Sequence, residues 1–99
     1  MKKMNEELYD IALKLKTNNQ RAVFCFIYEN PDCCLGEIRQ GTGIDKHGGL
    51  SVIRQLRDKG LIFFREDVVK HVRHYTVEYD KVDALVDSFM EQVELLLGD

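Results

Sequence analysis

A run of polar and basic residues between positions 46 and 55 has side chains that can read the edges of DNA bases. His47, Ser51 and Arg54 are separated by four and three positions, which places them on one stripe of a helix. Arginine can bond guanine O6 and N7 with two donors, and glutamine can pair with adenine N6 and N7 in the same bidentate way. The sequence therefore predicts a helix that enters a major groove, with these candidate contacts: Lys46, His47, Ser51, Arg54 and Gln55.

A second basic cluster follows in a segment with the pattern of a β-hairpin. Residues 71–77 alternate as a strand should, which places Arg73 and His74 on opposite sides. His74 is therefore interpreted either as a phosphate contact or as a half-buried structural histidine. Glu66 and Asp67 would repel phosphate, so the hairpin is expected to flank a duplex rather than insert its tip. The candidate phosphate contacts in this cluster are Arg65, Lys70, His71 and Arg73.

Two helices are predicted ahead of these candidate sites. Apolar residues recur at helical spacing over about residues 4–16. Residues 22–28 are apolar throughout, so by periodicity alone they could form a buried strand or a buried helix. The cap-rich segment 17–19 before them and Asn30-Pro31 after them favour a short second helix.

The next segment predicts a helix-turn-helix over residues 34–59. A short helix over 34–40 is followed by a glycine-bearing turn at 41–43. Asp45 is a natural N-cap for a fourth helix, and Gly60 supplies its C-terminal stop. A major groove is about 12 Å wide and accepts one such helix, while the helix before it braces against the DNA backbone.

A hairpin and a long helix complete the predicted fold. Residues 61–64 and 71–77 are predicted to be the strands of a wing that spans residues 61–77, and residues 79–97 an amphipathic helix. The predicted fold class is mainly α with a small β-hairpin. It is a single winged helix-turn-helix domain of order ααααββα over residues 1–99.

Three segments resemble winged-helix repressors of the ArsR type. Residues 35–44 (LGEIRQGTGI) are similar to the helix-turn segment of that family. Residues 53–62 (IRQLRDKGLI) are similar to its junction between recognition helix and wing, and residues 74–77 to the strand that leaves the wing. MarR-type and PadR-type regulators share much of this signature. The resemblance implies a transcriptional regulator that binds double-stranded DNA sequence-specifically, and we expect it to act as a dimeric repressor by occlusion.

The pair Gly48-Gly49 departs from that family pattern, in which small polar or β-branched residues are usual. Each glycine inside a helix costs about 1 kcal/mol relative to alanine. Two interpretations remain open. The missing side chains let the backbone approach DNA closely and offer helix amides to a phosphate, or the helix begins late, near Leu50.

The cysteines give a thiol-responsive or metal-responsive repressor as one alternative function. Cys34 matches the first position of the Cys-x-Cys that many ArsR-type proteins carry, but Gly36 occupies the second. Residues 78–99 contain no His and no Cys for the other type of metal site in that family. The side chains of adjacent Cys33 and Cys34 diverge and a closed zinc site needs four ligands, so no metal and no cofactor is predicted, although two cysteines per subunit could meet across a dimer. Cys25 is expected to be a small core residue.

Charge is unevenly distributed along this 99-residue chain, whose net charge is −3. Residues 38–75 carry eight Lys and Arg against four Asp and Glu, whereas residues 76–99 carry one lysine against seven acids. Phosphate attraction acts over a Debye length of about 8–10 Å, so the basic middle segment governs docking to DNA. Its modest excess of positive charge leaves a second alternative, a winged-helix module for protein–protein contact.

The outer helices, over residues 4–16 and 79–97, are expected to hold a homodimer together. A helix over residues 79–97 is about 28 Å long at about 1.5 Å per residue, which is more than a core of this size covers. Packing it against its symmetry mate would bury the surplus apolar stripe, and two recognition helices one helical turn apart would read a palindrome. The alternative is a monomer whose last helix folds back on the core.

Composition and motifs argue against several other classes of protein. The chain is 44% hydrophobic and 31% charged, and no apolar run reaches the roughly 18 residues that span a bilayer. We find no catalytic arrangement and no phosphate-binding glycine loop, so an enzyme is not expected. An odd number of cysteines, and no apolar stretch after Lys2-Lys3, predict a cytoplasmic protein without a membrane partner.

Overall fold

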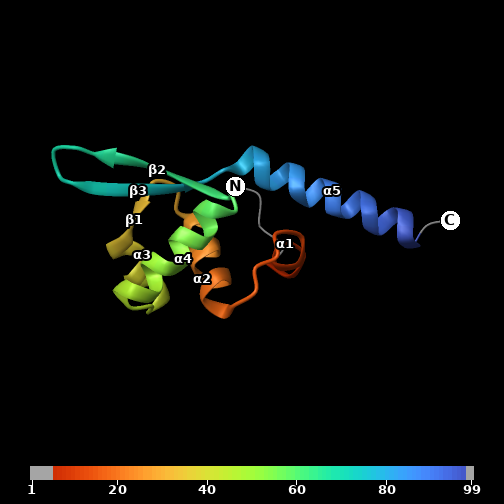
Figure 1. Cartoon of the computed structure of the whole chain (residues 1–99), viewed down its shortest axis with the longest axis horizontal. Helices are drawn as coiled ribbons and strands as arrows, with labels where there is room; N and C mark the ends of the chain where they lie inside the picture. Colours follow the sequence, from red (N-terminus) through yellow and green to blue (C-terminus); the bar gives the residue numbers. More distant parts are fainter. Residues whose placement is uncertain (1–5, 98–99) are drawn as a thin grey trace.

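The computed structural model describes residues 6–97, and these residues form a mainly helical fold with a small antiparallel sheet (Figure 1). Four helices precede the hairpin and one follows it, as the sequence predicts. The elements are α1 (Glu6–Ala12), α2 (Asn18–Glu29), β1 (Cys33–Cys34), α3 (Leu35–Thr42), α4 (Lys46–Asp58), β2 (Ile62–Asp67), β3 (Val72–Val77) and α5 (Tyr79–Leu97).

The sheet has the strand order β1-β3-β2, and each strand is antiparallel to its neighbour. β2 and β3 form the hairpin, with Phe64 opposite Tyr75 and Arg65 opposite His74. β1 is not predicted by the sequence, because two residues are too few for an alternating pattern to show. Its pairing of Cys33 with Tyr75 ties the start of α3 to the base of the hairpin.

One hydrophobic core joins α2, α3 and α4 to the inward side of the hairpin. The apolar run over 22–28 lies within α2, so the helix interpretation is confirmed and the strand interpretation is wrong. Thr17 caps this helix, since its hydroxyl accepts a hydrogen bond from the Gln20 amide at 3.1 Å. Full burial of an apolar side chain contributes roughly 1.5–3 kcal/mol. The largest fully buried side chains are Phe24, Ile27, Ile38, Leu56, Leu61, Val23, Val77 and Val82.

The first helix is shorter than predicted. It ends at Ala12 instead of continuing to about residue 16, and the predicted start at residue 4 lies outside the described residues. Lys14 has a φ of 57°, and the Leu15 amide donates to the Asp10 carbonyl at 2.9 Å, as in a Schellman-type helix end. Leu15 is buried all the same. The spacing of Leu15 from the earlier apolar residues therefore indicates that its side chain is buried, but it does not show that Leu15 belongs to the helix.

The turn between α3 and α4 begins later than predicted. Gly41 still belongs to α3, and a side chain there would overlap the ring of Phe26 in α2. The helix ends at Thr42 and is capped by Gly43, whose φ of 75° lies in the left-handed region that favours glycine. Gly43 therefore makes the turn, whereas Gly41 lets α3 pack closely on α2.

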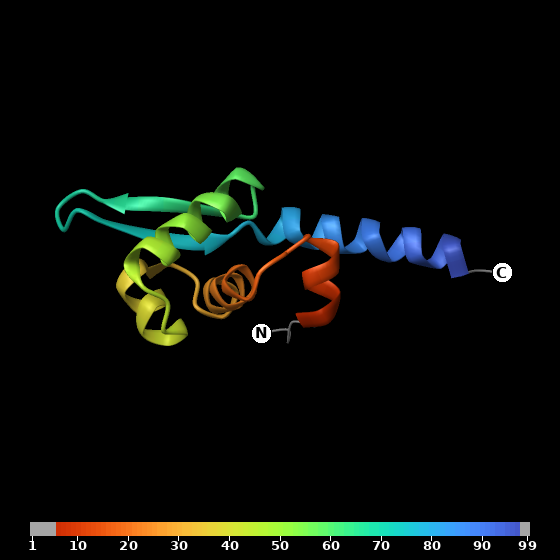
Figure 2. The same cartoon turned by 60° about the horizontal axis from the view of Figure 1, so that its bottom comes forward.

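The last helix, α5, has the predicted bounds; it contacts α1 and projects beyond α2, α3 and α4 (Figures 1 and 2). Its first turns are anchored, because the Tyr79 hydroxyl donates to the Tyr28 carbonyl at 2.7 Å and Val82 is buried. It does not fold back over the core. Leu96 near its far end is 86% exposed. None of the described helices is long and apolar enough to cross a membrane.

Candidate nucleic-acid interface

The predicted recognition helix, α4, begins at Lys46 and not near Leu50. The Asp45 carboxylate caps it by accepting a hydrogen bond from the Gly48 amide at 2.7 Å. A side chain at position 48 would crowd that carboxylate, and one at position 49 would press on Leu35 of α3. The late-start interpretation is therefore wrong, and the glycine pair is explained by the cap and by close packing of α3 on α4. A close approach of this backbone to DNA stays a prediction.

All five candidate residues on α4 are exposed. The ion pairs formed within residues 6–97 are Arg21–Asp10 and Arg65–Asp32, and neither of them includes an α4 residue. The cations on this helix thus carry charge that no carboxylate of the described chain neutralises. Four of these candidates form no side-chain hydrogen bond or ion pair within residues 6–97: Lys46, His47, Ser51 and Arg54.

Gln55 differs from the other α4 candidates because its amide is already engaged. Its Oε1 atom accepts a hydrogen bond from Nε2 of Gln20 in α2 at 2.7 Å, and Gln20 is buried. Base reading by Gln55 would require breaking this bond. One position separates it from Arg54, which is about 100° around a helix, so it lies toward α2 and away from the outer stripe.

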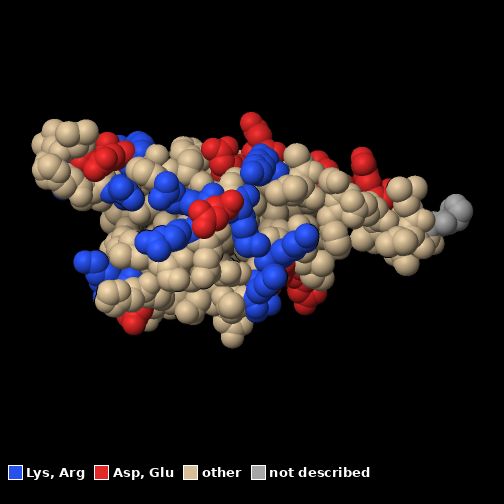
Figure 3. Space-filling view, viewed as in Figure 1, with Lys and Arg blue, Asp and Glu red and all other residues tan. Residues whose placement is uncertain are grey.

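Basic side chains gather on the face that α4 and the hairpin share. Figure 3 shows Lys and Arg side chains in a band over these elements, interrupted by a small acidic patch. Acidic side chains lie along α5 in the same view. The three-dimensional arrangement therefore agrees with the division of charge in the sequence.

Arg73 is joined on the inward face of the hairpin by an arginine that the sequence analysis missed. The guanidinium carbons of Arg57 in α4 and Arg73 in β3 each lie 4.4 Å from the centre of the Phe64 ring. The Phe64 ring also packs against Tyr75, with ring centres 6.1 Å apart. Arg57 lies three positions after Arg54, a helical spacing that could have suggested it. Nothing in the sequence pairs it with Phe64.

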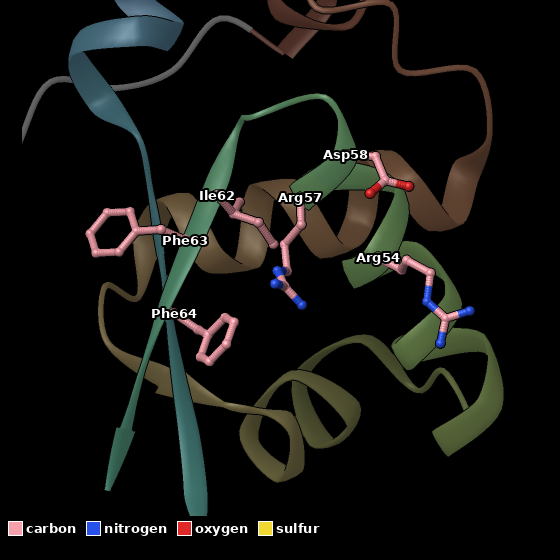
Figure 4. Close-up of a pocket in the computed structure, with 6 residues that line it drawn as sticks. All are labelled: Arg54, Arg57, Asp58, Ile62, Phe63 and Phe64. Atoms are coloured by element: carbon pink, nitrogen blue, oxygen red, sulfur yellow. The ribbon is translucent and has the colours of Figure 1, made fainter.

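The groove between α4 and β2 contains a cavity of about 400 Å³ (Figure 4). Figure 4 shows Phe63 and Phe64 leaving β2 on opposite sides, with Arg57 reaching from α4 into the space beside Phe64. Two guanidinium groups next to apolar walls suit an anion that carries an apolar flank, as a phosphodiester does. The lining residues are Arg54, Arg57, Asp58, Ile62, Phe63 and Phe64.

Arg65 lies on the opposite face of the hairpin, where its charge is paired. Its Nε and Nη2 atoms donate to the two carboxylate oxygens of Asp32 at 2.7 and 2.6 Å. These hydrogen bonds hold the pKa of Asp32 below its usual range. His74 Nδ1 donates to the Asp32 carbonyl at 3.1 Å, and His74 is half-buried. This contact favours the structural interpretation of His74.

The remaining wing candidates, Lys70 and His71, lie in the turn between β2 and β3. This turn is the end of the hairpin farthest from α5 (Figure 1). The Lys70 amide donates to Asp67 Oδ1 at 3.1 Å, and His71 has a φ of 54°. His71 therefore belongs to the turn, and the strand begins one residue later than predicted. Both side chains are exposed, as are those of Val68 and Val69. The tip is consequently a mixture of cationic and apolar groups.

The cysteines occupy three different environments. Burial raises the pKa of Cys33 to about 11, and burial followed by the nearby Glu6 carboxylate raises the pKa of Cys25 to about 11. Both therefore stay protonated, unreactive thiols at neutral pH. Cys34 is half-buried at the start of α3. Within residues 6–97, no three His, Cys, Asp or Glu side chains form a group that could hold a metal ion.

Comparison with known proteins identifies the fold. No protein-family model matches the sequence, and no curated protein matches it. Among solved structures, the chain is similar to BpsR of Bordetella bronchiseptica, whose DNA binding is regulated by 6-hydroxynicotinic acid. The identity is 23% and the TM-score 0.62, over 91% of this chain and 68% of BpsR.

Two further solved structures are similar over nearly the same part of the chain. The Staphylococcus aureus MepR–DNA complex has 20% identity and a TM-score of 0.64, over 91% of this chain and 81% of MepR. A MarR-family transcription regulator has 15% identity and a TM-score of 0.64, over 92% of this chain and 62% of that regulator. The ArsR-type resemblance is not confirmed by these comparisons. The chain has the winged-helix fold found in MarR-family regulators.

Proposed function

We propose that this protein is a non-enzymatic transcriptional regulator that binds double-stranded DNA as a homodimer, and that it acts as a cytoplasmic repressor by occluding its operator. The observation that carries the proposal is the unpaired cationic stripe on α4 beside the Arg57–Phe64–Arg73 cluster. A helix of this kind fits a major groove, and the adjoining hairpin cations reach the flanking phosphates. Structural similarity to MepR, solved bound to DNA, supports the same assignment.

Binding to a mixed-sequence duplex of about 25 base pairs, measured at several salt concentrations, tests the proposal. We expect the affinity to fall steeply with salt, and Arg54→Ala to weaken binding about tenfold with a salt slope smaller by about one. Arg21→Ala is the matched control, because the Arg21 guanidinium is paired with Asp10 at 3.0 Å. Binding that is absent, or that both variants weaken equally, contradicts the proposed interface and favours the protein–protein module.

The proposed homodimer is supported by apolar surface that the described chain leaves uncovered. Ile11 of α1 is 62% exposed, and α5 exposes several large apolar side chains. Large exposed apolar side chains gathered on one element are typical of interaction surfaces, which makes α5 the candidate dimer surface. The exposed members of α5 are Leu85, Met90, Leu95, Leu96 and Leu97.

Sedimentation tests this assembly. We expect a species of twice the 11.5 kDa chain mass for the parent. A Leu96→Glu variant should be largely monomeric and should bind DNA more weakly, because a charge cannot be buried unpaired in the interface. Asp80→Glu, on the same helix, preserves charge and is expected to leave the dimer intact. A parent that sediments at the single-chain mass contradicts the homodimer.

The thiol-responsive alternative can be separated from the main proposal. Burial raises the pKa of Cys33 and of Cys25, whereas Cys34 lies half-buried at the start of α3, so a response to oxidant is expected to begin at Cys34. An oxidant or Zn²⁺ should change DNA affinity in the parent and not in a Cys33→Ser, Cys34→Ser variant if this alternative holds. Equal responses of the two proteins exclude it.

A further inference from the structure

The Arg57–Phe64–Arg73 cluster joins side chains from three elements of the fold. Arg57 comes from the end of α4, Phe64 from β2 and Arg73 from β3. Both guanidinium carbons lie 4.4 Å from the ring centre, a distance at which a cation is attracted to the ring quadrupole. The Phe64 ring itself is held by Tyr75, which is buried. The ring therefore links the recognition helix to the wing.

Stacking leaves the hydrogen-bonding capacity of both arginines intact. The N–H donors of a guanidinium lie in its plane, so a ring over the face does not compete with an anion at the edge. Arg65 shows the opposite arrangement, since its Nε and Nη2 donors are used by Asp32. Arg57 and Arg73 are thus oriented without being neutralised.

The acidic side chains near the cluster do not form ion pairs with it. Asp58 lines the same cavity as Arg57, and Glu66 lies opposite Arg73 in the β-ladder. The two ion pairs within the described part of the chain are elsewhere, at Arg21 and Arg65. Both cluster arginines therefore keep their positive charge for an external anion.

We infer that Phe64 is a positioning residue for DNA binding, which holds Arg57 and Arg73 so that their donor edges meet phosphodiester groups on the strand beside the recognition helix. This inference rests on the proposed function. In this role Phe64 acts through the two arginines. It lowers the entropy that two long, flexible cationic side chains lose when they bind phosphate.

Substitutions at Phe64 that differ in their π-face test the inference. Phe64→Leu keeps an apolar side chain without an aromatic face, and Phe64→Tyr keeps the face. On a mixed-sequence duplex of about 25 base pairs, Phe64→Leu should weaken binding about fivefold and Phe64→Tyr less than about twofold. Phe64→Met replaces Phe64→Leu if circular dichroism shows that the leucine variant does not fold.

A double-mutant cycle separates positioning from simple packing. In an Arg57→Ala, Arg73→Ala background, Phe64→Leu should have no further effect on DNA affinity, because the side chains that it positions are gone. The same fivefold loss in that background overturns the inference, as does unchanged binding by Phe64→Leu in the parent. A parent without salt-dependent binding overturns the proposed function as well. A parent that binds but shows additive losses overturns the positioning role alone.

Discussion

The two faces of the hairpin use the same residue type in opposite ways. On the inward face, Arg73 lies over Phe64 and keeps its donor edge free. On the outward face, Arg65 donates two hydrogen bonds to the Asp32 carboxylate. The two environments belong to successive residue pairs of the hairpin, because Phe64 lies opposite Tyr75 and Arg65 lies opposite His74. Successive pairs point to opposite faces of the sheet. Side-chain alternation therefore sorts the wing arginines into one available for phosphate and one committed to the fold.

On the outward face of the hairpin, Asp32 connects the segment between α2 and β1 to the wing. Asp32 has a φ of 66°, and three wing residues hold it there. Arg65 binds its carboxylate, His74 binds its carbonyl, and the Thr76 hydroxyl accepts from its amide at 3.0 Å. The segment between α2 and β1 is consequently fixed to the wing. Counting basic residues in a wing overestimates its DNA contacts unless their carboxylate partners are known.

The largest expected effect is a loss of folding stability when Tyr75, the buried residue that packs against Phe64 on the inward face, is replaced. Tyr75 is 3% exposed and packs against Phe64, so Tyr75→Ala should lower the free energy of unfolding by about 3–5 kcal/mol. Phe63, on the outward side of β2, is 45% exposed, and Phe63→Ala should cost about 1 kcal/mol or less. Urea unfolding measures both. Equal costs would contradict the difference in burial between the two faces.

Local patterns in the sequence were sufficient for most of the fold. Asp45 and Gly43 are residue types that the ends of helices require, so the start of α4 and the turn before it could be located within about two residues. The bounds of α5 follow from its apolar period. The first helix was overestimated because Leu15 is buried without being helical, and periodicity cannot separate these two cases.

The site was predicted less completely, because its decisive contacts join distant residues. Gln55 meets Gln20 across 35 positions, and Arg65 meets Asp32 across 33. No spacing rule detects such partners in a single sequence. Arg57 was missed for the same reason, since its importance depends on Phe64 from another element. Residue type predicted which side chains could bind phosphate, and the tertiary partners decide which of them are free.

The comparison between the two arginines is tested directly by alanine substitutions. Arg73→Ala should weaken binding to a mixed-sequence duplex about five- to tenfold and reduce the salt slope by about one, because a phosphate contact is lost. Arg65→Ala should change the affinity less than about twofold and leave the slope unchanged. Fluorescence anisotropy over a salt series measures both quantities. A larger loss from Arg65→Ala than from Arg73→Ala would invert the assignment of the two faces.

The smallest expected effect is a pH-dependent loss of stability on the outward face. Hydrogen bonds from Arg65, then its charge and that of His74, hold the folded-state pKa of Asp32 below its usual value of 3.8. The ionised carboxylate therefore stabilises the fold above about pH 4, and this contribution disappears as the pH falls through the lowered pKa. Asp32→Asn should melt at a lower temperature than the parent at pH 7, and this difference should shrink as the pH falls below about 4.

Two further variants show whether that loss belongs to the ion pair. Arg65→Gln should reproduce the Asp32→Asn behaviour, because either change leaves the pair without one charge. Glu91→Gln, an exposed carboxylate of α5 outside both ion pairs, should show no such pH dependence. A melting-temperature difference that persists unchanged at pH 3 would mean that Asp32 acts through the backbone geometry at its positive φ and not through its charge. The outward face would then still be structural, but Arg65 would be free to bind phosphate, and the distinction between the two arginines would fail.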